Sequence, residues 1–166
     1  MRTVSTEVRP VTVEAAEALL ESDTAFRQRF GLDVAEGYLA FPEALPATLQ
    51  ALRSGTPPEW FSYLIVDAAE DLVVGLGGFT GPPSDGAVEV GYSVAPGHRG
   101  RGHATEAVRL WLDLAARSGV TLVRAHTLAE ESASTAVLTK LGFERVAEID
   151  GAEEGPLWRW ERPATR

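Results

Sequence analysis

The sequence predicts an α/β fold, in which a mixed, mostly antiparallel sheet of six or seven strands is flanked by helices. Short runs of β-branched and aromatic residues alternate with turn signals, as in a meander of antiparallel strands. An amphipathic helical stretch then separates the last of these runs from another, and a strand–helix–strand unit requires a parallel pair of strands. A chain of 166 residues fits one domain, so residues 1–166 are expected to form a single unit.

The first 55 residues predict a strand, a helix and an irregular helical region. Residues 7–10 form a short extended run, and Thr12 is a suitable N-cap for an alanine-rich helix at residues 13–20. Residues 23–53 keep a helical spacing of apolar residues, but two glycines and two prolines interrupt it. We therefore expect broken helices there.

The middle of the chain predicts three antiparallel strands. Two apolar runs, at residues 60–66 and 72–79, are joined by a polar stretch suited to a hairpin turn. Residues 81–86 carry a second turn signal, which is rich in glycine and proline. The run at residues 87–94 then predicts the third strand of a meander.

The most regular helical pattern follows this meander. Apolar residues recur at helical spacing through residues 104–115, and Gly119 is placed to end the helix. The remaining predicted elements are a strand at residues 121–125, a helix at residues 133–141 and a closing hairpin at residues 145–149 and 157–162.

Composition excludes several classes of function. The net charge of −9 repels phosphate backbones and anionic lipids, so neither nucleic acid nor a membrane is expected as a partner. The absence of cysteine excludes disulfides, thiolate metal sites and a cysteine nucleophile, and no metal is expected. No apolar run has the length of a signal peptide or a membrane span, which predicts a cytoplasmic protein.

Residues 97–105 predict an anion site. Three glycines let the backbone curl at the start of the predicted helix, where free N–H groups attract anions. Arg99 and Arg101 beside His98 concentrate positive charge in an acidic protein, which favours a phosphate or diphosphate ligand. A plain strand-to-helix connection with solvated arginines is the alternative. The spacing matches neither a dinucleotide-binding fingerprint, because Thr105 stands at the position of its last glycine, nor a P-loop.

The residues of this loop carry a resemblance to a known family. Residues 99–104, Arg-Gly-Arg-Gly-His-Ala, resemble the Gln/Arg-x-x-Gly-x-Gly/Ala signature of the GNAT N-acetyltransferase superfamily. Residues 88–94 resemble the family's fourth strand, and residues 125–127 with Ser134 and residues 140–143 resemble its later motif. The resemblance points to the branch that contains the ribosomal-protein-alanine N-acetyltransferases. It extends over about residues 60–150, and over the first 55 residues only in outline.

The resemblance implies the acyl-coenzyme A N-acyltransferase fold and an acetyl-coenzyme A site. Two strands part around Val94 and Ala125, the amides of residues 101–105 bind the diphosphate, and the N–H near Val94 polarises the thioester carbonyl. Glu131 stands where many relatives carry an asparagine that contacts the pantetheine arm. The cofactor-binding residues implied in this way are Val94, Arg99, Gly100, Arg101, Gly102, His103, Ala104, Thr105, Glu131 and Ser134.

The resemblance also implies two catalytic residues. Glu89 lies on the fourth strand of the family, where a carboxylate acts as general base, and its alternative role is that of a solvent-facing strand residue. Ser134 matches a position that helps to protonate the leaving thiolate, and otherwise it is simply a polar residue in the first turn of a helix. His126 is an alternative base. No tyrosine lies near Leu138, where other branches keep a general acid.

The expected activity is transfer of acetyl from acetyl-coenzyme A to a primary amine, with no metal. A protein N-terminus and a small-molecule amine are both open as acceptors, and a homodimer is left open. The family covers its acceptor with the early helices, so the aromatic residues among positions 26–61 either line that site or pack in the core. The alternative function is a non-catalytic acyl-coenzyme A binding or sensing module, which Glu131 and the missing tyrosine would suit.

Overall fold

The strands of the protein form one mixed sheet. The computed structural model describes residues 5–165. The sheet runs in the order β1-β3-β4-β5-β6-β8-β7, and β2 pairs with β4 outside this path. The strands are β1 (Thr6–Pro10), β2 (Asp33–Val34), β3 (Ser62–Asp67), β4 (Leu72–Phe79), β5 (Ala87–Val94), β6 (Leu122–Leu128), β7 (Glu144–Asp150) and β8 (Pro156–Pro163).

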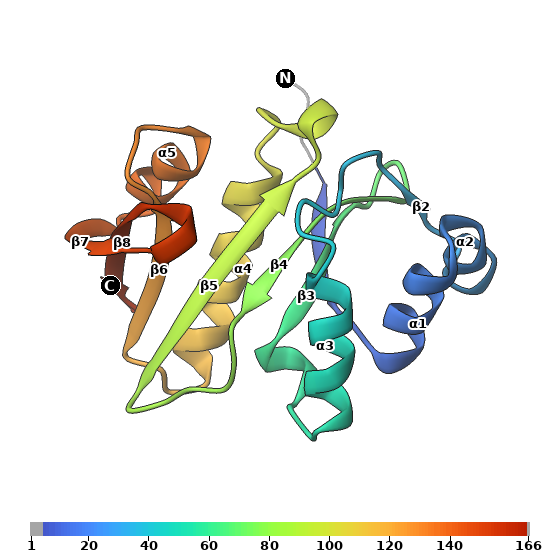
Figure 1. The fold of residues 1–166 in the computed structure, drawn as a ribbon, viewed down its shortest axis with the longest axis horizontal. Coiled ribbons are helices and arrows are strands. Elements are labelled where there is room, and N and C mark those ends of the chain that lie inside the picture. The colour runs from blue at the N-terminus through green and yellow to red at the C-terminus, as the bar shows by residue number, and fades with distance from the viewer. Residues whose placement is uncertain (1–4, 166) are drawn as a thin grey trace.

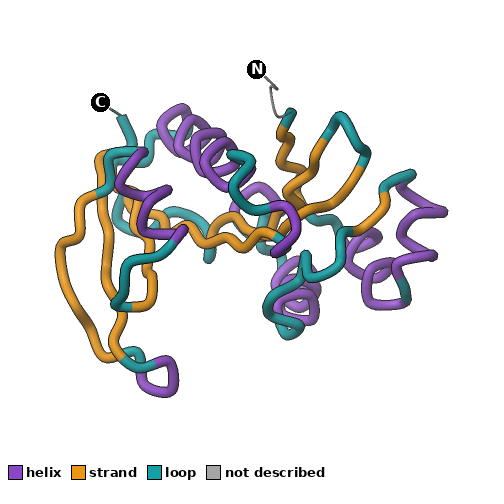
Figure 2. Tube along the Cα trace, turned by 90° about the horizontal axis from the view of Figure 1, so that it is seen from above, coloured by secondary structure: helices purple, strands orange, loops and turns teal. Residues whose placement is uncertain are grey.

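Helices cover both faces of this sheet (Figures 1 and 2). The helices are α1 (Val13–Glu21), α2 (Asp23–Phe30), α3 (Ala44–Arg53), α4 (His103–Arg117) and α5 (Ala133–Lys140). Helices α1 to α3 pack with β3 and β4 around one apolar cluster, which includes Phe26 and Leu64. Helices α4 and α5 pack on the opposite face around a second cluster, centred on Trp111 and Leu138. Among the described residues, no helix combines the length and the apolar character needed to cross a bilayer.

The pairing of the strands confirms the predicted topology. Strands β3, β4 and β5 form the antiparallel meander, and β1 pairs with β3 at the edge. Helix α4 connects β5 to β6, which lie parallel, so the sheet is mixed as expected. Strand β8 lies between β6 and β7 and is antiparallel to both. The prediction of six or seven strands omitted β2, which pairs only two residues with β4.

Local signals explain where the N-terminal elements begin and end. The side chain of Thr12 accepts a hydrogen bond from the N–H of Ala15 at 3.1 Å, which confirms it as the N-cap of α1. Gly31 adopts a left-handed conformation (φ 72°) and ends α2. The expected break in the helical region falls between α2 and α3, where the chain adds β2.

Candidate active site

The loop before α4 has the geometry of an anion cradle. Gly100 (φ 76°) and Gly102 (φ 89°) both adopt left-handed backbone conformations, and Gly102 is the N-cap of α4. A Cβ atom at either glycine would meet no other atom within 4 Å, so open space lies beside both. Within the described part of the chain, the N–H groups of residues 99–105 donate to no acceptor. These free donors stand at the positive end of the dipole of α4, where an anion is stabilised.

The charged side chains of this loop are only partly free. The Nε atom of Arg99 donates to the carbonyl oxygen of Val94 at 3.0 Å, which ties the loop to the end of β5. Nη1 of Arg101 lies 3.5 Å from Nδ1 of His98, and Arg101 is otherwise exposed. Both guanidinium groups therefore keep donors for an anion, and one of them also fixes the loop on the strand.

Among the predicted residues of this loop, His103 is the buried one. Its imidazole is buried, with Nδ1 2.9 Å from Oγ1 of Thr6. Its Nε2 lies 3.6 Å from Oδ2 of Asp67, too far for a hydrogen bond. Burial lowers the pKa of His103, against the opposing effect of Asp67. The imidazole of His103 is therefore not available to an anion in the loop, whereas its backbone N–H is.

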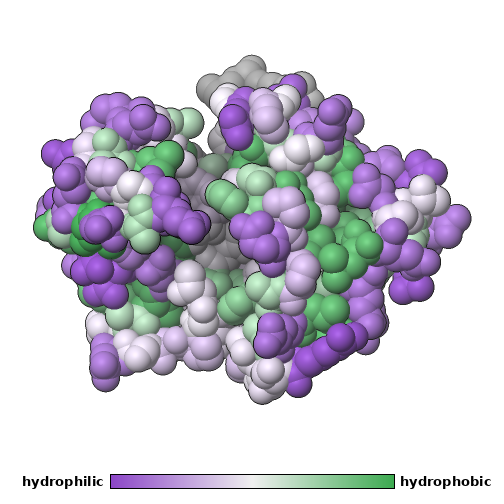
Figure 3. All heavy atoms as spheres, viewed as in Figure 1, coloured by the Kyte–Doolittle hydropathy of each residue, from purple (hydrophilic) through white to green (hydrophobic). Residues whose placement is uncertain are grey.

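Beside this loop, β5 and β6 part. Their pairing ends at Val90 and Ala125, although β5 continues to Val94 and β6 to Leu128. The space-filling view shows a notch in the same region, between the end of β5 and the lobe formed by β6 to β8 with α5 (Figure 3). The predicted parting of two strands around Val94 and Ala125 is therefore present.

The unpaired edge of β5 offers backbone groups to the gap. The N–H of Thr80 donates to the carbonyl of Glu89, and that of Ala95 to Val74, so odd-numbered residues bond to β4. In an antiparallel ladder the backbone groups of alternate residues point the other way. Tyr92 and Val94 consequently direct theirs toward β6, and beyond Val90 no strand pairs with them.

Glu89 belongs to a hydrogen-bonded chain on the α1–α3 face of the sheet. Its Oε2 lies 3.1 Å from Nδ1 of His126, and Nε of Arg159 donates to the other ring nitrogen, Nε2, at 3.2 Å. The side chain of Glu89 is 35% exposed, so it is neither buried nor fully solvated. The structure thus brings together Glu89 and His126, which the sequence offered as separate candidates for the base.

Arg159 was not singled out from the sequence. Its register partner on β6 is His126, and strand alternation would have placed both on one face had the β6–β8 pairing been known. A second pair, Arg124 and Glu161, lies next along the same two strands with an ion pair of 2.8 Å.

Ser134 lies on the opposite side of the gap, in the first turn of α5. The hydroxyl of Tyr92 donates to the carbonyl of Ser134 at 3.2 Å, so a phenol reaches from β5 to α5. Burial raises the pKa of Tyr92 to about 12, which keeps the phenol protonated. Tyr92 was also missed from the sequence, although alternation along its strand places it on the side of α4 and α5. The neighbouring Glu131 is exposed, and its carboxylate accepts a hydrogen bond from Oγ1 of Thr135 at 3.3 Å.

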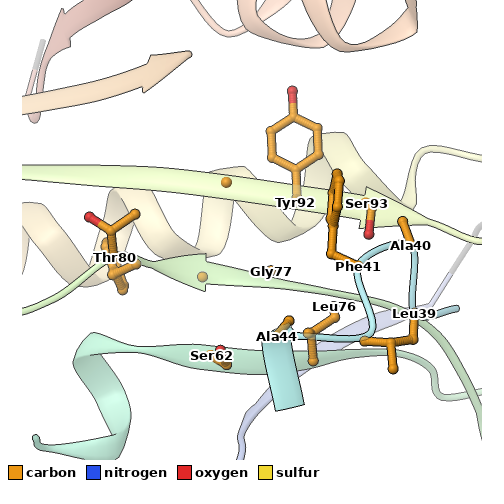
Figure 4. A pocket seen from close by; sticks show the side chains of 13 residues that line it. Leu39, Ala40, Phe41, Ala44, Ser62, Leu76, Gly77, Thr80, Tyr92 and Ser93 are labelled. Atoms are coloured by element: carbon orange, nitrogen blue, oxygen red, sulfur yellow. The ribbon is translucent and has the colours of Figure 1, made fainter. Parts of the chain in front are cut away.

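A hollow of about 240 Å³ opens on the α1–α3 face, beside the unpaired part of β5. Its lining includes Leu39 and Phe41 from the segment before α3, Leu76 from β4 and Ser93 from β5. Figure 4 shows Phe41 standing over β5 near Ser93, whereas the hydroxyl of Tyr92 points away from Leu76. Phe41 thus lines a cavity, while Phe26 is buried in the core.

The site suits a diphosphate attached to an extended arm. The open glycine loop provides free N–H donors, and the adjacent gap provides the unpaired edge of β5 along which an amide-containing arm can bind. Within residues 5–165, no group of three or more histidine, aspartate or glutamate side chains is arranged to hold a metal ion.

The chain belongs to the GNAT acetyltransferase family. The family described as Acetyltransferase (GNAT) domain matches residues 6–144, which confirms the predicted membership. A curated relative, the uncharacterized N-acetyltransferase YjdG of Bacillus subtilis (strain 168), is 31% identical over 106 residues, or 62% of this chain. The chain spans 63% of the length of that relative.

Solved structures share the fold. The ribosomal-protein-S5-alanine acetyltransferase from Vibrio fischeri superposes with a TM-score of 0.70, covering 99% of this chain and 96% of that one at 16% identity. RimJ of Mycobacterium smegmatis, solved in complex with CoA-disulfide, gives a TM-score of 0.68, covering 96% and 82% at 19% identity. These neighbours confirm the predicted fold.

Proposed function

We propose that the protein transfers the acetyl group of acetyl-coenzyme A to a primary amine, either a protein N-terminus or a small-molecule amine. The observation that carries this proposal is the placement of an open anion loop next to a gap between two strands, with Glu89 on the strand that borders the gap. Family membership supports it, and a protein of the same fold has been solved with CoA-disulfide.

The loop and the gap would hold acetyl-coenzyme A, which supplies an acetyl group activated as a thioester. The N–H groups of residues 101–105 bind the diphosphate, in the space that Gly100 and Gly102 leave open. Arg99 and Arg101 add positive charge at the same place. The exposed Glu131 and the first turn of α5 flank the arm on the other side of the gap. Many relatives carry an asparagine at this position, which can both donate and accept hydrogen bonds. The carboxylate of Glu131 can only accept them, so it would bind an amide N–H group of the arm.

Direct attack by the amine requires no nucleophile from the protein. The amine nitrogen forms a C–N bond to the acyl carbon while the C–S bond breaks. The N–H of Val94 donates to the carbonyl oxygen as negative charge develops on it. Glu89 accepts the proton that the amine loses, directly or through a water molecule. The hydroxyl of Ser134 passes a proton to the leaving sulfur and takes one up from a water molecule in exchange.

A base is needed because acceptor amines are largely protonated near neutral pH. An N-terminal amine has a pKa of about 7.7 to 8.0 and a lysine side chain about 10.4. His126 does not fill this role, since both of its ring nitrogens are engaged, one by Glu89 and one by Arg159. Glu89 is the carboxylate on β5, one residue before the pairing with β6 ends at Val90.

The test measures thiol release from acetyl-coenzyme A with a panel of amines. Glu89→Gln is expected to lower kcat/KM at least 100-fold while calorimetry gives an unchanged affinity for coenzyme A. Glu161→Gln is the matched control, because Glu161 lies on the same face and pairs with Arg124 instead of His126. Coenzyme A binding without turnover of any amine would instead support a non-catalytic sensing module.

A further inference from the structure

The hollow beside β5 lies next to the proposed base. It is lined by Gly91 and Ser93, which share a strand face with Glu89. Thr80 lines this hollow and also an adjoining one that contains Glu89 and Arg124. The substituent of an amine that presents its nitrogen to Glu89 therefore has the hollow within reach.

No charged side chain lines the hollow, although charged residues make up 23% of the chain. Its apolar side chains include Leu39, Phe41 and Leu76, with a few hydroxyl groups among them. One of these hydroxyls, that of Ser62, already pairs with Thr48 at 2.7 Å. A cation or carboxylate placed here would lose its hydration without gaining an opposite charge, which is strongly unfavourable.

Phe41 is the most exposed large apolar residue at the site. Its side chain is 62% exposed, and it stands at the rim of the hollow (Figure 4). Covering this ring with an apolar group removes apolar surface from water, which favours binding. A cation over the same ring would gain only the weak cation–π attraction typical of an exposed aromatic residue.

The glycines of β4 and β5 differ in the space beside them, and only the glycine on β5 leaves room in the hollow. A Cβ atom at Gly77 would come within 2.7 Å of Trp111, and one at Gly78 would strike the carbonyl of Phe61, so those glycines serve close packing. A Cβ atom at Gly91 would meet nothing within 4 Å. Gly91 thus leaves unfilled the floor of the hollow on the face of Glu89.

We infer that the acceptor is a primary amine whose adjoining substituent is apolar and uncharged, and that this substituent binds between Phe41 and Gly91. Amines with cationic or anionic substituents at that position are poor acceptors. The inference rests on the proposed acetyl transfer and narrows it to a substrate class. The net charge of −9, taken by itself, would instead suit a cationic acceptor.

The test compares four amino-acid amides that share one acylatable α-amine: leucinamide, glycinamide, glutamic acid α-amide and argininamide. We expect kcat/KM for leucinamide to exceed that for argininamide and for the glutamic acid amide by at least about tenfold. Equal or better acetylation of argininamide would overturn the inference while leaving acetyl transfer in place. If none of the four amides and no amine of the wider panel is acetylated, both the inference about the substituent and the proposed acetyl transfer are overturned.

Two substitutions test whether the hollow sets this preference. Phe41 is exposed, and Phe41→Asp is expected to shift the ratio of kcat/KM for leucinamide to that for argininamide about tenfold in favour of argininamide. Gly91→Val is expected to lower kcat/KM for leucinamide more than for glycinamide, because the added methyl groups fill the floor. Val146→Asp places the same charge at a half-exposed apolar residue on β7 and should leave the ratio as it is. An unchanged ratio in both test variants would show that the substituent binds elsewhere.

Discussion

Nδ1 of His126 lies 3.1 Å from Oε2 of Glu89, and Nε of Arg159 donates to the opposite ring nitrogen of the same histidine at 3.2 Å. A guanidinium group has no acceptor, so Nε2 of His126 receives that hydrogen bond. In the neutral ring the proton then resides on Nδ1 and is donated to Glu89. His126 is therefore a positioning residue that orients the proposed base.

Removal of this donor should slow turnover without weakening coenzyme binding. We expect His126→Ala to lower kcat about tenfold, while the affinity for coenzyme A from calorimetry stays the same. His126→Asn should recover much of the loss, because an amide N–H can replace the Nδ1 donor. Equal kcat values for the alanine and asparagine variants would contradict the positioning role.

Gly102, in the loop before α4, should be essential for binding the diphosphate. Gly102→Glu places bulk and negative charge in the open space beside the free N–H groups, so coenzyme A binding is expected to disappear in calorimetry. Gly119→Glu is the matched control, since Gly119 also has a positive φ (82°) and open space but lies at the other end of α4. The two variants should lose similar stability, and only the first should lose binding. Retained affinity in Gly102→Glu would rule out this loop as the diphosphate site.

The buried His103 should make the stability of the fold depend on pH. Burial holds its pKa in the folded protein below the usual 6.5, so the unfolded chain binds more protons in the interval between the two values. The free energy of unfolding is therefore expected to fall as the pH falls through about 6.5, and this part of the loss ends below the folded pKa.

Urea denaturation at several pH values measures this effect. The difference between the protein and His103→Gln should isolate the contribution of His103, because the substitution removes that imidazole alone. His98→Gln, in the same loop but less buried, is the control and should keep the pH dependence. A His103→Gln variant with the same pH dependence as the unaltered protein would contradict the prediction.

The contact between Tyr92 and Ser134 should matter for the departure of the thiol. Ser134→Ala removes the proposed proton donor and is expected to lower kcat about tenfold or more. Tyr92→Phe removes only the hydrogen bond to the carbonyl of Ser134 and should have a smaller effect. With a pKa of about 12, Tyr92 should add no alkaline limb to the pH–rate profile below about pH 10. Such a limb, lost in Tyr92→Phe, would show that the phenol itself donates the proton.

The parts of the site that could be predicted are those encoded by neighbouring residues. Gly100 and Gly102 precede the most regular helical pattern in the chain, and a glycine-rich turn at a helix start exposes its N–H groups whatever the rest of the fold does. Glu89 could be placed on a strand by its alternating neighbours. The conformation of residues 23–53 could not be predicted in detail, because β2 exists only through its pairing with β4.

Contacts between distant segments lay beyond any local pattern. Tyr92 meets Ser134, and Thr6 meets His103, only after β5, α5, β1 and α4 have packed together. Sequence reasoning assigned His103 to the anion site as part of its motif, and packing turned its imidazole into the core.

The amino-acid sequence by itself determined the order of the strands and helices other than β2, the turn that offers free amides to an anion, and the residue types available for acid–base chemistry. Those features depend on periodicity, turn residues and backbone conformations that act over a few positions. The tertiary structure decided which side chains meet: that His126 and Arg159 support Glu89, and that an uncharged hollow opens beside Gly91. The register between strands sets these contacts, and burial of a face of the sheet against its helices specifies that register.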